Sequence, residues 1–409
     1  MTSTNMLNWE EGIWKNENAP EADAEVLIAS DWAPIRAFDR VIMETPEGVY
    51  GDLLPVLRES DLRIVNLECP LCGHNTPVWK SGSVLKGKAE HVRGLRVVPF
   101  EVVTLGNNHV FDYGTTAFAQ TLAVLEENGI AAVGAGMSTR EAKTPLRLEV
   151  NGIRVGIVNF SEGEDLTAAT NGPGVFGWEV EAVAAVINAI KASVDIVIVV
   201  CHCGLEYIPI PPPYVARAFR HLADAGAHLV VGHHPHVPQG LHIYHQVPIC
   251  YSLGNFVFYQ ETDLLYRKVG FFVKAGLAKG AVAYLKLVPY GIRKAGLHLL
   301  NREERQWFLK EMRTVSMPLD TPAAIEDAWH GFLHYYGTQG LRGEIGMILE
   351  KMRDEPRKGA AMLRNRLTTM QHNQHWIDML TRIMNDDLAT SPQWAYNLAE
   401  KWLTAITMT

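Results

Sequence analysis

The chain has 409 residues, of which 47% are hydrophobic and 20% are charged, and its formal net charge is −8. This length predicts two domains, or one large and one small, with a substantial core. Because the charge is acidic and no run of lysine and arginine is long, we expect no binding to nucleic acid. The N-terminus does not resemble a signal peptide, and no stretch reaches the ~18–20 apolar residues of a membrane span. We therefore expect a cytoplasmic protein with no membrane partner.

Short apolar runs rich in valine and isoleucine recur through the first two thirds of the chain, as is typical of buried strands. In chain order, these runs end at Ser30, Glu68, His109, Phe160, Gly204, His236 and Phe258. Stretches with helical spacing separate several of them, and two of these stop at Gly129 and Gly226, where glycine favours a helix end. Strands that alternate with helices predict an α/β fold. Residues 269–290 hold two runs with no helix between them, which predicts an antiparallel hairpin near a sheet edge.

The composition changes near residue 300, because the stretches beyond it have helical spacing and few strand-forming residues. Thr321-Pro322 and Ser391-Pro392 are typical helix starts, with a capping residue before a proline. We predict three parts: a polar N-terminal segment (1–23), an α/β domain (24–299) and a C-terminal helical module (300–409). The module would either cap a pocket of the α/β domain or form the interface of a homo-oligomer.

Side chains that bind metals recur where the apolar runs end. They are Asp31, Asn66, Glu68, Asn107, Asn108, His109, Asp112, His202, Glu206, His234 and His236. Ligand sites in open α/β sheets form beyond the carboxyl ends of the strands, so we expect these side chains to converge. Mixed imidazole and carboxylate ligands suit Mn, Fe or Zn. The sequence therefore predicts one or two divalent transition metals, and two such ions would activate a hydroxide.

Five segments between residues 24 and 260 resemble, as an ordered set, the motifs of the CapA (poly-γ-glutamate synthesis protein) family. They are NLECPL, GNNHVFDYG, HCGLEY, GHHPHVPQG and YSLGNFVF. That family belongs to the calcineurin-like metallophosphatase superfamily. The resemblance implies a four-layer α/β/β/α metallophosphatase-like sandwich with the metal centre at the sheet edge. It does not extend to residues 300–409.

The resemblance also implies roles for individual residues. The metal ligands would be Asp31, Glu68, Asn108, His202, His234 and His236, with Glu68 between the two metals. His109 would face the substrate, Asp112 would orient His109, and His233 would be a bystander or a supporting group. The superfamily places a histidine two residues after the first aspartate, where this chain has Ala33. One metal site would therefore lack a ligand, which leaves a mononuclear centre open.

A second group of polar residues is predicted to contact the substrate. It consists of Asn66, Asn107, Glu162, Glu206 and Asn255. Several have a structural interpretation as well, because Asn107 could form a turn, Glu206 could lie on the surface and Asn255 could hold its own turn. The basic residues from Lys80 to Arg96 could steer an anionic substrate or form a solvated face.

Cysteine and histidine clusters elsewhere offer rival sites. A thiolate zinc site could include Cys69, Cys72, Cys201 and Cys203. Strand alternation would turn Cys69 and Cys203 away from their neighbours Glu68 and His202, so we predict free, buried thiols. His372 and His375 have a helical spacing that could hold a metal, but Trp376 beside them favours a packing or interface role.

These patterns together predict a metal-dependent hydrolase. Its metal-activated hydroxide would attack a phosphoester or an amide bond, including a γ-glutamyl bond, of a small or oligomeric anionic substrate. His109, oriented by Asp112, would stabilise developing charge or protonate the leaving group. The alternative is a non-catalytic, metal-containing accessory protein in the synthesis of an anionic polymer such as poly-γ-glutamate.

Overall fold

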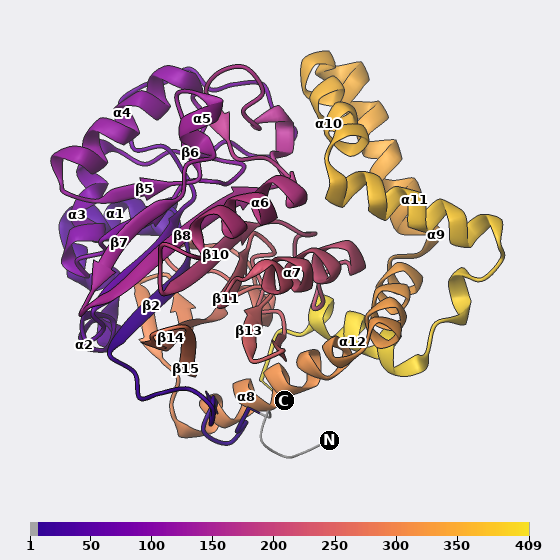
Figure 1. Cartoon of the computed structure of the whole chain (residues 1–409). Helices are drawn as coiled ribbons and strands as arrows, with labels where there is room; N and C mark the ends of the chain where they lie inside the picture. Colours follow the sequence, from indigo (N-terminus) through magenta and orange to yellow (C-terminus); the bar gives the residue numbers. More distant parts are fainter. Residues whose placement is uncertain (1–6, 409) are drawn as a thin grey trace.

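The computed structural model describes residues 7–408, and two β-sheets form its centre (Figure 1). One sheet has the strand order β1-β15-β14-β2-β3-β4-β5, with β16 beside β15. Its strands are Ile13–Lys15 (β1), Ala24–Trp32 (β2), Leu62–Leu67 (β3), Val102–Thr104 (β4), Ala131–Val133 (β5), Val269–Ala278 (β14), Ala281–Arg293 (β15) and Gly296–Leu299 (β16). Strands β2 to β5 are parallel to one another, and β14 and β15 form the predicted antiparallel hairpin.

The second sheet has the strand order β12-β13-β11-β10-β8-β7. Its strands are Leu146–Val150 (β7), Ile153–Ser161 (β8), Ile196–His202 (β10), Leu229–His233 (β11), Leu241–Tyr244 (β12) and Val247–Cys250 (β13). Strands β8, β10, β11 and β13 run parallel. A small ribbon pairs β6 (Ala135–Gly136) with β9 (Gly174–Val175).

The alternation of side chains along the strands builds four layers. In β2, Val26 and Ile28 point into the core between the sheets, whereas Leu27 and Ala29 pack against the outer helices. The helices on that face are Ala37–Glu44 (α1), Leu54–Arg58 (α2), Val92–Val97 (α3) and Gly114–Glu127 (α4). The second sheet is covered by Val180–Ile190 (α6) and Pro213–Ala225 (α7), and a short helix, Thr139–Ala142 (α5), precedes β7. This arrangement confirms the predicted α/β/β/α sandwich.

The chain after Leu299 is helical, and these helices lie to one side of the sandwich (Figure 1). They are Arg302–Ser316 (α8), Pro322–Asp354 (α9), Pro356–Thr368 (α10), Met370–Met384 (α11) and Gln393–Thr404 (α12). Gly337 has a φ of 62° and interrupts α9. Within residues 7–408, no helix combines the length and the apolar character needed to cross a bilayer. The division into three domains stays a prediction, and the first six residues of segment 1–23 lie outside the described range.

Two local predictions differ from the structure. Thr321 caps α9 as expected, accepting a hydrogen bond from the Ala324 N–H at 3.2 Å, but Ser391 does not cap α12. Its hydroxyl lies 2.8 Å from Nδ1 of His334 instead. The predicted strand to Phe258 ends at Cys250, and the chain turns at Gly254, which has a φ of 80°.

Gly232 in β11 is predicted to be essential for the close approach of neighbouring backbone. A methyl group on its Cα would collide with the backbone oxygen of Tyr251. Gly232→Ala should therefore lower the free energy of unfolding by about 1–3 kcal/mol, measured by urea denaturation. Gly343→Ala is the control, because no described atom lies within 4 Å of the added methyl, and alanine favours the helix by about 1 kcal/mol. Equal stability of the two variants would contradict the packing argument.

Candidate metal centre

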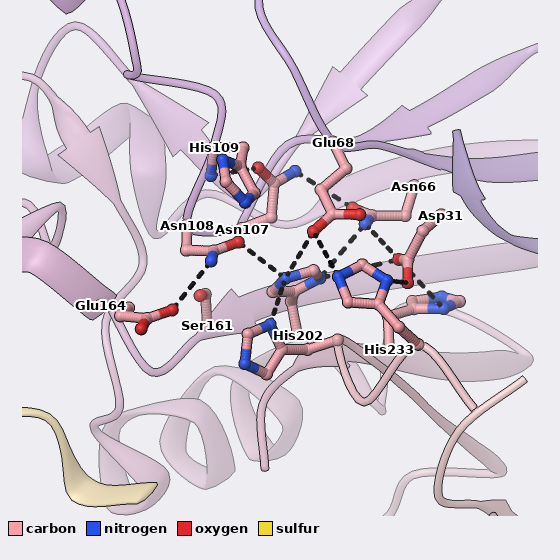
Figure 2. Close-up of polar contacts among 12 residues, drawn as sticks. Asp31, Asn66, Glu68, Asn107, Asn108, His109, Ser161, Glu164, His202 and His233 are labelled. Atoms are coloured by element: carbon pink, nitrogen blue, oxygen red, sulfur yellow. Dashed lines mark hydrogen bonds and ion pairs between the residues drawn. The ribbon is translucent and has the colours of Figure 1, made fainter. Parts of the chain in front are cut away.

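The carboxyl ends of both parallel strand sets deliver side chains to one buried point (Figure 2). Asp31 lies near the end of β2, Glu68 follows β3, and His202 is the last residue of β10. Asn108 follows β4, and His234 and His236 follow β11. All six predicted metal ligands are brought together, and each is at most 4% exposed.

The first group of ligand atoms comes from Glu68, His202 and His234, which approach within 4.8 Å of one another. Nε2 of His202 lies 3.4 Å from Oε1 of Glu68 and 3.1 Å from Nδ1 of His234. Oδ1 of Asn108 lies 3.0 Å from the same Nε2. These atoms surround a single position where a cation would meet nitrogen and oxygen donors.

The second group consists of Asp31, Glu68 and His236, so Glu68 belongs to both. His236 lies between the two carboxylates, with Nδ1 3.6 Å from Oδ2 of Asp31 and Nε2 3.6 Å from Oε1 of Glu68. Glu206 forms a third group with His234 and His236. Its Oε1 lies 4.0 Å from Nε2 of His236.

The two buried carboxylates, Asp31 and Glu68, accept few hydrogen bonds. Within residues 7–408, neither oxygen of Glu68 and only one oxygen of Asp31 accepts a hydrogen bond. Burial raises the pKa of Asp31 to about 7, and burial with the nearby Asp31 charge raises the pKa of Glu68 well above its ordinary value. A buried, uncompensated carboxylate is costly, and a divalent cation would compensate both. The donor set therefore fits a metal ion.

The imidazoles are in the form that binds metals. Burial lowers the pKa of His202, His234 and His236, and neighbouring imidazoles lower it further for His202 and His236. All three are therefore neutral near pH 7, as a metal ligand must be. His234 and His236 also have φ values of 101° and 56°. Such backbone costs on the order of 1–3 kcal/mol per residue and clusters at functional sites.

His233 and Ala33 adjoin the second group without contributing to it. Nδ1 of His233 lies 3.2 Å from the Ser30 hydroxyl and 3.9 Å from Oδ1 of Asp31. His233 therefore stands beside Asp31, outside the three groups of ligand atoms. Ala33 is fully buried and offers no ligand, so the second group has three protein ligands.

Three asparagines predicted to touch the substrate make hydrogen bonds around the site: Asn66 and Asn255 to metal ligands, and Asn107 to the backbone of Leu67 and His109. Nδ2 of Asn66 donates to Oδ1 of Asp31 at 2.8 Å, and Oδ1 of Asn255 lies 2.9 Å from Nδ1 of His236. Oδ1 of Asn107 accepts from the His109 N–H at 3.1 Å, and its Nδ2 donates to the Leu67 carbonyl at 2.8 Å. The polar atoms of these asparagines thus make hydrogen bonds inside the protein, and their predicted contacts with a substrate stay a prediction.

His109, Asp112 and Lys80 form a buried chain beside the ligands. Nδ1 of His109 lies 2.6 Å from Oδ2 of Asp112, as the predicted orienting role requires. Lys80 donates to Oδ1 of Asp112 at 2.7 Å and to the Asn108 carbonyl at 2.8 Å. Burial raises the pKa of Asp112, but His109 and Lys80 outweigh this effect and hold it below its ordinary value.

Lys80 was predicted to steer substrate or to face solvent, and its burial at 3% exposure contradicts a solvated face. The ion pair of Lys80 with Asp112 could not be predicted from the local sequence, because the two residues are 32 positions apart. The five cysteines are free and buried, which confirms the prediction for them.

A cavity of about 260 Å³ lies over the ligands. It is lined by Arg36, Lys80, Ser81, Gly82, Ser83, Leu85, Asn108, His109, Glu164, Asp165, Glu206, Tyr207, His236, Phe258, Gln260, Arg366 and His372. Glu206 faces the cavity as predicted. Glu162 does not line it, because its carboxylate accepts from the Tyr214 hydroxyl and the Gly204 N–H, and burial raises its pKa to about 8.

Two lining residues come from the C-terminal helices and were not predicted to belong to the site. Arg366 lies in α10, and His372 lies in α11. Nε2 of His372 is 3.1 Å from Oε1 of Glu164, another lining residue. His372 is buried and packs against the loop of Glu164, and it lines the cavity as well. Only the three-residue spacing to His375 hinted at a functional role.

Comparisons with known proteins agree with this geometry. The family model described as "Bacterial capsule synthesis protein PGA_cap" matches residues 20–260. That range contains all six predicted metal ligands and ends before the C-terminal helices.

Curated relatives cover a similar part of the chain. It is 34% identical over 218 residues to the PGA biosynthesis protein CapA of Bacillus subtilis, covering 52% of this chain and 57% of that protein. It is 31% identical over 255 residues to the capsule biosynthesis protein CapA of Bacillus anthracis, covering 60% and 62%. A probable polyglutamine synthesis accessory protein of Mycobacterium tuberculosis is 28% identical over 296 residues, covering 65% and 76%. The match therefore spans less than two thirds of the length of either Bacillus protein.

Solved structures give weaker likenesses. A hypothetical protein from Thermus thermophilus matches with a TM-score of 0.43 at 18% identity, covering 66% of this chain and 100% of that one. A 5'-nucleotidase precursor from the same organism matches with a TM-score of 0.42 at 14% identity, covering 71% and 57%. Both TM-scores are below 0.5.

Metal binding is predicted to stabilise the protein through Glu68. Manganese at a hundred times its dissociation constant should add about 2.7 kcal/mol to the free energy of unfolding, visible as a higher Tm that EDTA reverses. Glu68→Gln should lose this gain, whereas Glu326→Gln, which changes an exposed carboxylate paired with Arg217, should keep it. A manganese-dependent gain in Tm that survives Glu68→Gln would contradict the assignment.

Removal of the Lys80 ammonium is predicted to leave Asp112 as an uncompensated buried charge. Lys80→Met should therefore lower the free energy of unfolding by about 3–5 kcal/mol in urea denaturation. Lys88→Met is the matched control, since Lys88 and its partner Asp39 are 51% and 41% exposed and their pair contributes at most about 1 kcal/mol. Similar losses in the two variants would refute a special role for Lys80.

Proposed function

Because the chain belongs to the family of bacterial capsule synthesis proteins described by the PGA_cap model, we propose that it is a metal-dependent hydrolase of an anionic substrate. The observation that carries the proposal is the pair of ligand groups that share Glu68. Beside them, the imidazole of His109 is held by a buried carboxylate and faces the cavity. Ligands, proton donor and substrate space thus lie at one place.

Asp31, Glu68, Asn108, His202, His234 and His236 would hold one or two divalent transition metals, and this mixture of donors suits Mn, Fe or Zn. A bound metal would supply Lewis acidity and a strong nucleophile derived from water at neutral pH. The second ligand group has three protein ligands, so its metal is expected to exchange more readily than the metal of the first group.

His109 would act as the general acid. Its Nδ1 donates to the ionised Asp112, which leaves Nε2 free to deliver a proton to the leaving group. Lys80 keeps Asp112 ionised from its other side. This assignment makes His109 the catalytic residue, and Asp112 and Lys80 are positioning residues that act through its imidazole.

The lining of the cavity supports an anionic substrate. Arg36, Lys80 and Arg366 line it together with Glu164, Asp165 and Glu206, so the divalent metals would supply the excess of positive charge. Glu206 faces the same space and is the carboxylate available for an amine or hydroxyl of the substrate. Phosphoester and amide bonds both suit this chemistry. Of these two bond types, the amide of a γ-glutamyl group is favoured by the names of the relatives, which refer to PGA biosynthesis and polyglutamine synthesis.

A second function is favoured by one specific observation. The Mycobacterium tuberculosis relative is named a probable accessory protein of polyglutamine synthesis. In that role the chain would bind metal and an anionic polymer without hydrolysing a bond. The metal centre would then be structural, and exchange of the metal would leave polymer binding intact.

Hydrolysis is predicted for the manganese-loaded protein with chromogenic substrates of both bond types, bis-p-nitrophenyl phosphate and γ-glutamyl-p-nitroanilide. His109→Ala should retain metal and lower the rate on the active substrate by about 10²–10⁴-fold, as expected for loss of a general acid. His202→Ala should lose metal and activity together. His221→Ala, which changes an exposed imidazole on α7, is the control. Turnover of neither substrate by metal-loaded wild-type protein would contradict the hydrolase and favour the accessory role.

A further inference from the structure

Glu164 connects the C-terminal helices to the metal centre. It lies in the loop after β8, and its side chain is 12% exposed. Its Oε1 accepts from Nδ2 of Asn365 in α10 at 2.8 Å and lies 3.1 Å from Nε2 of His372 in α11. Its Oε2 accepts from Nδ2 of Asn108 at 2.8 Å, and Figure 2 shows this contact beside the ligand cluster.

The contact with Glu164 decides which end of the Asn108 amide faces the metal position. An ionised carboxylate only accepts hydrogen bonds, so it holds the NH₂ end of the amide. The oxygen Oδ1 then points to His202, whose Nε2 is 3.0 Å away. Only the oxygen of an amide can bind a divalent cation here. Turning the amide over would remove a ligand from the first group.

The helices are anchored to the loops around the site by several hydrogen bonds. Asn365 is fully buried, donates to the Ser81 hydroxyl at 2.9 Å and accepts from the Asp165 N–H at 3.0 Å. Lys358 of α10 donates to the carbonyl of Gly82 at 2.6 Å. The contacts reach two different loops, so α10 and α11 are fixed over the cavity at more than one point.

We propose that α10 and α11 form a positioning cap of the metal centre, in which Asn365 and His372 hold Glu164 so that Asn108 presents its oxygen to the metal. Glu164, Asn365 and His372 are positioning residues, because they act on the metal through Asn108. The inference rests on the proposed function for the presence of a metal. It adds that residues beyond the family match at 20–260 are part of the working site.

The test is the manganese affinity of the full chain, measured by calorimetry without any substrate. Glu164→Gln should weaken binding about tenfold, the lower end of the range for partners that orient metal ligands. His372→Ala should weaken it in the same direction, and the double variant should bind no worse than Glu164→Gln, since both act through one carboxylate. His372→Gln keeps an N–H donor and should restore affinity.

Arg364→Ala is the matched control, because Arg364 precedes Asn365 in α10 and its side chain is exposed. It should bind manganese like the wild type. Circular dichroism melts would identify any variant that fails to fold. If His372→Ala fails to fold, the manganese affinity of His372→Gln is compared with that of Glu164→Gln. Unchanged affinity in Glu164→Gln, or additive losses in the double variant, would overturn the proposal.

The two proposals fail in different ways. Tight manganese binding without hydrolysis would refute the proposed hydrolase activity. The manganese affinities of the Glu164 and His372 variants would still test the positioning cap. Hydrolysis by wild-type protein with unchanged affinity in Glu164→Gln would refute the cap and leave the enzyme standing.

Discussion

The buried carboxylate of Glu68 is the constraint on which the rest of the site depends. It lies between the ends of two sheets, and no residue from 7 to 408 donates a hydrogen bond to either oxygen. His202 and His236 approach it from opposite groups, at 3.4 and 3.6 Å. Their imidazoles are neutral because burial lowers their pKa, so they cannot neutralise the charge. A divalent cation would satisfy both the carboxylate and the imidazoles.

The fold explains why these groups meet. Two parallel strand sets end at the same edge of the sandwich. Oδ1 of Asp31 in β2 therefore lies 3.8 Å from Nδ1 of His202 in β10, although the two residues are 171 positions apart in the chain. The asparagines Asn66 and Asn255 then fix Asp31 and His236 in place. The loops, which are free to differ between proteins, supply the proton donor His109 and the acidic side chain Glu164. Rigid strand ends thus hold the metal ligands, and loops and helices adapt the space above them.

Much of this architecture could be predicted from the sequence, because it depends on short-range patterns of residue types. Short apolar runs rich in valine and isoleucine predicted the strands, and glycines predicted the ends of α4 and α7. Ligand types at the ends of these runs predicted a site, and the resemblance to the CapA family implied which six residues would bind metal. The same reasoning could not show what Asn66, Asn107 and Asn255 contact, since an amide beside a ligand residue gives the same sequence pattern whether it faces a substrate or a neighbouring side chain. Burial and hydrogen bonding decide between the two, and both are tertiary properties.

Long-range contacts account for what the sequence analysis missed. Lys80 donates a hydrogen bond to Asp112, which is 32 residues away in the chain, and Glu164 contacts His372, which is 208 residues away. Neither pair has a spacing that local periodicity can detect.

The presence of a metal beside Glu68 can be tested most directly by anomalous X-ray diffraction from crystals of manganese-loaded protein. The account predicts a peak among Glu68, Asn108, His202 and His234, with a weaker one between Asp31, Glu68 and His236. Ordered density for Glu68 with no anomalous peak beside it would contradict the account.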